Sequence, residues 1–124
     1  MVDGTTLGPM SLPQAPAFLK HQVDEAVAKG GRVLCGGSPV HDGAGKGRFF
    51  KPTLVADCTQ DMSIMTEESF GPVVAVAPVD SDEHAVALMN DSKYGLTGAV
   101  FTKNVDRFNG IASKLQVGTV YMNR

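Results

Sequence analysis

The chain has 124 residues and a mass of 13.0 kDa, which suits one domain, and its 43% hydrophobic and 19% charged residues are typical of a globular protein. Its formal net charge of -2 provides no basic surface for nucleic acid or an anionic membrane, and no apolar run approaches the roughly 20 residues that cross a bilayer. The first ten residues lack the basic and apolar regions of a signal peptide, so we expect a cytoplasmic protein.

Glycine and proline divide the chain into short elements. In chain order we expect an irregular lead-in at 3–11, a helix near 13–29, a strand at 32–35, a turn-rich loop at 38–48, a returning strand at 49–57 and a short helix near 63–68. The first helix is indicated by Leu19, Val23 and Ala26, which recur at helical spacing. Gly30-Gly31 then ends it.

The second half of the chain alternates strands with helices. We expect a strand at 73–79, a helix that begins at Ser81, a strand at 96–102, a helix capped by Asn104 and a final strand at 117–123. The continuous apolar run at 73–79 is typical of a strand buried on both faces. The alternation predicts an α/β fold, with a mostly parallel sheet and helices on both faces.

Few residues are arranged for chemistry of their own. Two cysteines and three widely spaced histidines predict neither a disulfide framework nor a metal site. We expect Cys35, inside a short strand, to be a buried small apolar residue, and we do not expect Cys58, on a loop after a strand, to be a reactive thiol. The glycine-rich stretch 42–47 lacks the spacing of a phosphate-binding loop, because the pattern G-x-x-x-x-G-K-[ST] is absent and Arg48, not serine or threonine, follows Gly47. We interpret the stretch as a hairpin tip.

The acidic turn, residues 66–72 with the sequence TEESFGP, is the most informative segment. It places two carboxylates and an aromatic ring next to a Gly-Pro corner, directly before the most apolar run. A carboxylate can accept hydrogen bonds from a ribose diol, and a phenyl ring offers a flat apolar contact to a heteroaromatic ring. The same residues are also typical of an acidic surface turn with a core phenylalanine, so both interpretations stay open at this point.

Five motifs occur in order along almost the whole chain: LGPM (7–10), GRFFKPTLV (47–55), MTEESFGPVV (65–74), NDSKYGLTGAVFT (90–102) and GTVYMN (118–123). Together they resemble the NAD(P)-dependent aldehyde dehydrogenases. The resemblance implies that residues 1–124 form one segment similar to the C-terminal half of the catalytic domain. It also implies that Glu68 contacts the nicotinamide ribose, that Phe70 lies against the nicotinamide ring, and that Gly71 and Pro72 shape the turn.

In that family a cysteine thiolate attacks the aldehyde, hydride passes to NAD or NADP, and a glutamate-activated water releases the acid. The motifs that carry the nucleophile, the general base, the oxyanion asparagine and the glycine-containing cofactor loop have no match in these residues. Neither Cys35 nor Cys58 stands in the context of the nucleophile. We therefore assign no catalytic residue here, and we expect no dehydrogenase activity from the chain alone.

Three hypotheses follow. The first is a fragment of an aldehyde dehydrogenase that carries the Glu68 and Phe70 cofactor contact and functions within a homo-oligomer that acts on an aldehyde. The second is a stand-alone, inactive α/β module whose apolar strand edges and faces are covered by self-association or by a partner protein. The third and weakest is a small nucleotide-binding protein that uses the acidic turn alone.

Overall fold

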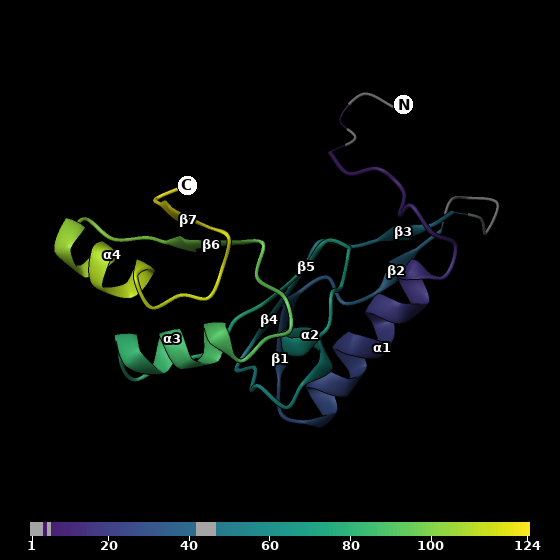
Figure 1. Ribbon diagram of the computed structural model, residues 1–124. Coiled ribbons are helices and arrows are strands. Elements are labelled where there is room, and N and C mark those ends of the chain that lie inside the picture. The colour runs from purple at the N-terminus through teal and green to yellow at the C-terminus, as the bar shows by residue number, and fades with distance from the viewer. Residues whose placement is uncertain (1–3, 5, 42–46) are drawn as a thin grey trace. The chain divides into compact units, whose positions relative to one another are not determined.

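Residues 4, 6–41 and 47–124 are described by the computed structural model, in which the chain divides into unit 1, Met1–Pro78, and unit 2, Val79–Arg124 (Figure 1). Unit 1 contains α1 (Ala15–Ala28), β1 (Arg32–Cys35), β2 (Pro39–Val40), β3 (Phe49–Phe50), β4 (Thr53–Ala56), α2 (Ser63–Thr66) and β5 (Val73–Ala75). Unit 2 contains α3 (Asp82–Asn90), β6 (Thr97–Val100), α4 (Val105–Ala112) and β7 (Thr119–Met122).

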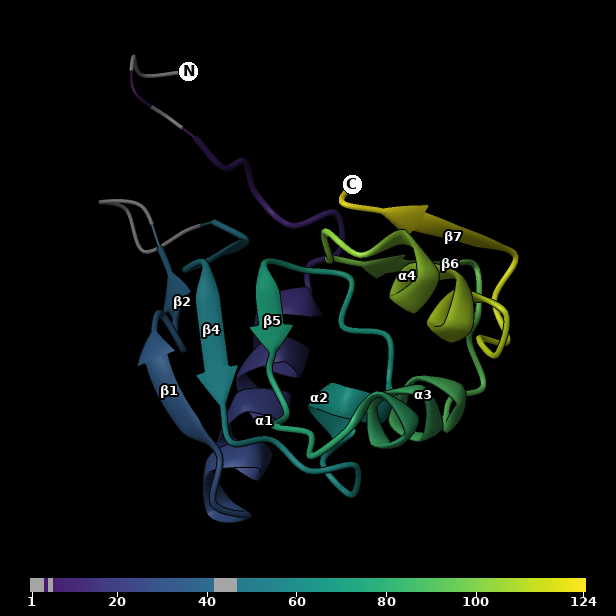
Figure 2. The ribbon, with the colours of Figure 1, turned by 90° about the vertical axis from the view of Figure 1, so that its left-hand side faces the viewer.

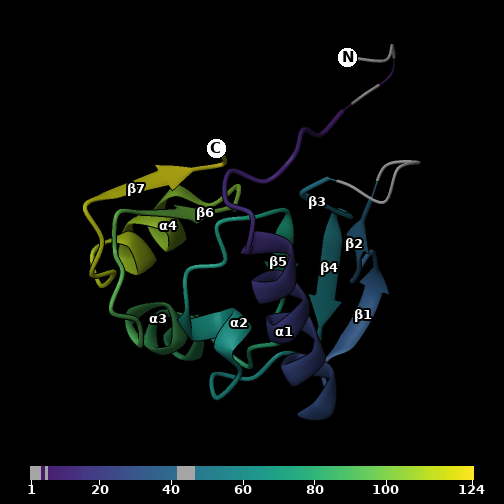
Figure 3. The same ribbon diagram turned by 90° about the vertical axis from the view of Figure 1, so that its right-hand side faces the viewer.

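Helix α1 supplies the largest part of the unit 1 core. It begins two residues later and ends one residue earlier than the helix predicted at 13–29, with a proline in its first turn where no backbone N–H is needed. Leu19, Val23 and Ala26 are almost fully buried, and Figures 2 and 3 show the helix lying across one face of the sheet formed by β1, β4 and β5. The buried cluster of unit 1 consists of Leu19, Val23, Ala26, Phe50, Val55, Cys58, Met62 and Ile64.

The sheet of unit 1 has the order β1-β4-β5. Strand β4 pairs in parallel with β5 and antiparallel with β1, and the backbone N–H of Thr53 donates to the Pro72 carbonyl at 2.8 Å, where β4 and β5 begin. A second pair, β2 with β3, is antiparallel and flanks the glycine-rich stretch. The predicted hairpin tip itself, residues 42–46, lies outside the described residues.

Unit 2 packs α3 and α4 with a parallel pair of strands, β6 and β7. Both predicted helix caps are confirmed: the Ser81 hydroxyl accepts from the His84 N–H, and the Asn104 amide oxygen accepts from the Arg107 N–H. The Arg107 guanidinium also donates two hydrogen bonds to the Asp82 carboxylate, at 2.8 and 2.6 Å, and so joins the first turns of the two helices. This bidentate pair lowers the pKa of Asp82.

Two asparagines of unit 2 tie its elements together through both atoms of their side-chain amides. Asn90, at the end of α3, donates to the Lys114 carbonyl at 2.9 Å and accepts from the Gln116 N–H at 2.8 Å. Asn123, just after β7, donates to the Thr102 carbonyl at 2.8 Å and accepts from the Thr102 N–H at 2.9 Å. Each asparagine therefore replaces missing backbone pairing with a reciprocal side-chain bridge.

The α/β class is confirmed, and the strand pairing corrects several details. Among the described residues, two strand pairs are parallel and two are antiparallel, in three separate sheets. The strand expected at 49–57 is divided into β3 and β4, because Pro52 between them has no N–H for a ladder. The run at 73–79 is a regular strand only over β5, although backbone hydrogen bonds to Val55 and Cys58 continue to Val76. Val74 and Val76 are 59% and 48% exposed, so the run is not buried on both faces.

The close approach of Gly36 to Pro52, just after β1, can be tested with Gly30, before β1, as the control. Both have a positive φ, of 75° and 101°, but a Cβ at Gly36 would overlap the Pro52 carbonyl oxygen, whereas nothing lies within 4 Å of a Cβ at Gly30. We predict that Gly30→Ala costs about 1 kcal/mol of unfolding free energy, from backbone strain alone. Gly36→Ala should cost about 3 kcal/mol or more, because it adds a backbone overlap. Urea unfolding of the two variants measures the difference, and equal losses would contradict the described approach of Gly36 to Pro52.

Candidate functional site

The acidic turn lies between α2 and β5, at the amino ends of β4 and β5. Ligand sites of parallel sheets are usually found at the opposite, carboxyl edge. Its two ends are fixed by backbone hydrogen bonds: the Glu67 N–H donates to the Ser63 carbonyl at 2.8 Å, and the Pro72 carbonyl accepts from Thr53. The acidic turn therefore joins a short helix to a strand, and its backbone is fixed at both ends.

The middle of the acidic turn presents its side chains to solvent. Glu68 is exposed, and the Phe70 side chain is 76% exposed, so Phe70 is not the core phenylalanine of the alternative interpretation. Phe70 also adopts a φ of 48°, in the left-handed region that costs a residue with a side chain about 1 kcal/mol. An exposed aromatic ring on a strained backbone contributes little to folding and is typical of a binding position.

The structure places the exposed cysteine in β1 and the buried cysteine on the loop after β4. Cys35 is exposed, with its Sγ 3.7 Å from the Pro52 carbonyl oxygen, whereas Cys58 is 1% exposed and its Sγ donates to the Val55 carbonyl. Burial is the main reason why the pKa of the Cys58 thiol is raised. Cys58 is thus an inert core residue, and the expectation that Cys35 is buried was wrong.

Within residues 4, 6–41 and 47–124, no group of three or more metal-binding side chains is gathered in one place. The same part of the chain has no helix that is both long and apolar enough to cross a bilayer. Neither finding adds a residue to the candidate site.

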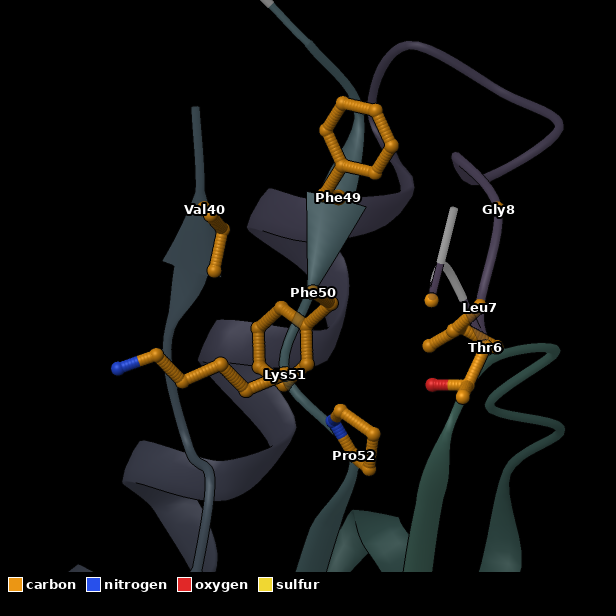
Figure 4. Close-up of a pocket in the computed structure, with 9 residues that line it drawn as sticks. Thr6, Leu7, Gly8, Val40, Phe49, Phe50, Lys51 and Pro52 are labelled. Atoms are coloured by element: carbon orange, nitrogen blue, oxygen red, sulfur yellow. The ribbon is translucent and has the colours of Figure 1, made fainter. Parts of the chain in front are cut away.

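A shallow cavity of about 340 Å³ lies beside β2 and β3, and its lining is apart from the acidic turn. The residues that line it are Gly4, Thr6, Leu7, Gly8, Val40, Phe49, Phe50, Lys51 and Pro52. Figure 4 shows Thr6 and Leu7 facing Phe50 and Pro52, while the amino group of Lys51 points away from them. Among the described residues of this lining, Lys51 is the one that is ionisable, so they include no acid–base pair for catalysis.

A second cavity, of about 310 Å³, lies in unit 2 between the end of α3 and β6. Met89, Tyr94, Leu96 and Val117 give it a largely apolar lining, with Ser92, Gly95 and Thr97. It contains no carboxylate, histidine or cysteine. Of the sites that the sequence suggested, only the acidic turn therefore retains chemical interest.

Comparison with known proteins gives one consistent result. The sequence profile of the aldehyde dehydrogenase family matches the chain over residues 1–124. A succinate-semialdehyde dehydrogenase [NADP(+)] of Deinococcus radiodurans is 46% identical over 120 residues, which are 96% of this chain and 24% of that protein. The lactaldehyde dehydrogenase of Escherichia coli is 41% identical over 118 residues, which are 95% of this chain and 24% of that protein.

Solved structures agree with the sequence comparisons. The crystal structure of a betaine aldehyde dehydrogenase from Staphylococcus aureus in complex with NAD+ has a TM-score of 0.87 at 38% identity, over 98% of this chain and 24% of that chain. The lactaldehyde dehydrogenase from Escherichia coli has a TM-score of 0.86 at 40% identity, over 94% of this chain and 24% of that chain. The chain spans about a quarter of the length of these relatives.

The strained backbone of Phe70 leads to a direct prediction. Phe70→Gly and Phe70→Ala both remove the exposed ring, but only glycine accepts the φ of 48° without strain. We expect the glycine variant to be more stable than the alanine variant by about 1 kcal/mol. Chemical denaturation of the two variants under the same conditions measures this difference. Identical unfolding free energies would mean that residue 70 does not adopt the left-handed conformation in solution.

Proposed function

Because the chain belongs to the aldehyde dehydrogenase family, we propose that it is a segment of an NAD(P)-dependent enzyme that oxidises an aldehyde to a carboxylic acid. The support is a family match over residues 1–124 together with an α/β fold like that of solved members at TM-scores of 0.86 and 0.87. The residues here supply part of the cofactor contact, and the nucleophile and the general base belong to other segments of such an enzyme.

Within this function we assign Glu68 and Phe70 to the nicotinamide half of the cofactor. The observation that carries this assignment is their exposure on a held turn, with Phe70 in a strained conformation that folding does not require. The Glu68 carboxylate can accept hydrogen bonds from both hydroxyls of a ribose, and the Phe70 ring can cover a planar heterocycle. These residue types therefore fit a nicotinamide riboside group.

NAD(P)+ supplies the hydride acceptor when it is bound. The chain's own part in the reaction is to hold and orient that acceptor through Glu68 and Phe70, since neither Cys35 nor Cys58 stands in the sequence context of the family's nucleophile. Orientation of this kind affects the affinity for the cofactor and the rate together, because it defines the geometry of the reacting ring.

A second candidate function is a stand-alone module, inactive by itself, that self-associates or binds a partner protein. It is favoured by large exposed apolar side chains in both units, among them Val74 on β5 at 59% exposure and, on either side of β6, Leu96 at 85% and Phe101 at 75%. A homo-oligomer in the cytoplasm would cover such surfaces. With its net charge of -2, this candidate has no role on nucleic acid or on an anionic membrane.

The cofactor contact is tested in a chimera in which these residues replace the matching segment of the Escherichia coli lactaldehyde dehydrogenase. We predict that Glu68→Ala raises the KM for NAD+ about tenfold or more, because charge-assisted hydrogen bonds of about 1.5–3 kcal/mol are lost. Glu67→Ala, at the neighbouring exposed carboxylate, is the matched control and should change it by less than about twofold. Steady-state kinetics with NAD+ as the varied substrate measures both. Similar effects at the two positions would overturn the assignment of Glu68.

The stand-alone candidate is tested by the mass of the chain in solution. If self-association covers the apolar strands, gel filtration with light scattering should give a multiple of 13.0 kDa. The double variant Phe101→Ser/Leu96→Ser should shift the mass toward the monomer, because it removes the two most exposed of these apolar side chains in unit 2. A stable monomer that leaves a hydrophobic dye unbound would contradict this candidate.

A further inference from the structure

The Glu25 carboxylate of helix α1 contacts the first residue of α2, Ser63. One oxygen of Glu25, Oε2, accepts from both the backbone N–H of Ser63, at 2.8 Å, and the Ser63 hydroxyl. The other oxygen, Oε1, lies 2.7 Å from the Lys29 amino group. Lys29 in turn donates to the backbone carbonyl of Asp61, just before α2. A single carboxylate thus joins two segments that are 38 residues apart.

Two more residues of α1 extend this contact along the same side of the helix. Gln22 is fully buried, and its side-chain amide donates to the Ser63 carbonyl at 3.4 Å. Leu19 packs so closely under Gly71 that a Cβ at that position would overlap the Leu19 Cδ1 atom. Leu19, Gln22 and Glu25 are spaced three residues apart, so they form one stripe of α1. The stripe contacts the chain on both sides of the segment that contains Glu68 and Phe70.

The charge on Glu25 keeps this contact strong. Lys29 and then Ser63 lower the pKa of the Glu25 carboxyl to about 2, so the carboxylate is ionised at neutral pH and accepts all three hydrogen bonds. A carboxyl with a lowered pKa stabilises the fold above its ordinary pKa of 4.5, and this stabilisation is lost as the pH falls toward 2. At the near-neutral pH of an enzyme assay, Glu25 is therefore ionised and its hydrogen bonds to Ser63 and Lys29 are all formed.

We propose that Glu25 and Leu19 are positioning residues that fix the backbone on either side of Glu68 and Phe70, at Ser63 before the acidic turn and at Gly71 within it, and so set the direction in which Phe70 and Glu68 project. The proposal rests on the proposed function for its relevance to the cofactor. Its physical content concerns the turn alone. The hydrogen bonds to Ser63 fix where α2 begins, and the Leu19 contact fixes the corner that follows Phe70, so the residues between them have little freedom to move.

The test uses the whole chain labelled with fluorinated phenylalanine, which gives six signals in the ¹⁹F NMR spectrum. The signal of Phe70 is identified by its loss in Phe70→Leu. We predict that Glu25→Ala shifts or broadens the Phe70 signal and leaves the signal of the buried Phe50 in place. Ser63→Ala should do the same to a smaller extent, because the Ser63 N–H still donates to Glu25. Ser63→Thr keeps the hydroxyl that donates to Glu25, so its Phe70 signal should match that of the unsubstituted chain.

Asp24→Ala is the matched control, because the neighbouring carboxylate of Asp24 pairs with Lys20 on the exposed side of α1. Its Phe70 signal should not change. If Glu25→Ala does not fold, as judged by the Phe50 signal, Ser63→Ala decides the question, since it removes one hydroxyl group only. A folded Ser63→Ala or Glu25→Ala chain with an unchanged Phe70 signal would overturn the proposal.

The failure of this proposal and the failure of the cofactor assignment give different results. The ¹⁹F signal reports the surroundings and mobility of the Phe70 ring without any cofactor, whereas the KM of the Glu68 variant reports the cofactor contact. In the chimera, Glu25→Ala should raise the KM for NAD+ about fivefold and leave the KM for the aldehyde within about twofold. An altered ¹⁹F signal with an unchanged KM for NAD+ would confirm the positioning of the turn and refute its contact with the cofactor.

Discussion

The burial of one side of α1 against β4 and α2 is the interaction on which unit 1 depends. Leu19, Val23 and Ala26 supply apolar area to the cluster around Val55, and fully burying a leucine or valine side chain stabilises a fold by about 1.5–3 kcal/mol. Glu25, on the same side of the helix, holds the start of α2 through its hydrogen bonds to Ser63. Core packing and the placement of the acidic turn are therefore two consequences of one helix, and a change in the angle of α1 would alter both.

The helices of this chain were predictable because their signals are local. Ser81 and Asn104 each cap a helix within three residues of their own position, and Gly30-Gly31 ends α1 where the sequence predicts. Strand limits depend on partners that are distant in sequence. The sequence gives no sign of β2, which is two residues long and exists by pairing with Phe49 and Phe50.

The candidate site shows the same division between local and distant information. The motif around residues 65–74 indicated Glu68 and Phe70, but no pattern reveals that Phe70 has a positive φ or that Glu25 reaches Ser63. Cys35 shows how one extra residue in a strand changes the exposure of the side chains that follow it. The pairing of β1 with β4 shifts its register between Val33 and Cys35, and such a bulge redirects the side chains that follow it. Cys35 is therefore exposed, although it lies two residues after the half-buried Val33.

The reciprocal bridges of Asn90 and Asn123 depend on an intact side-chain amide at each position. Each amide uses its nitrogen as a donor and its oxygen as an acceptor at the same time. Deamidation converts asparagine to aspartate, which keeps the acceptor, loses the donor and brings a negative charge toward a backbone carbonyl. The slow loss of ammonia at either position would loosen the ends of α3 or β7 without any change in the apolar core.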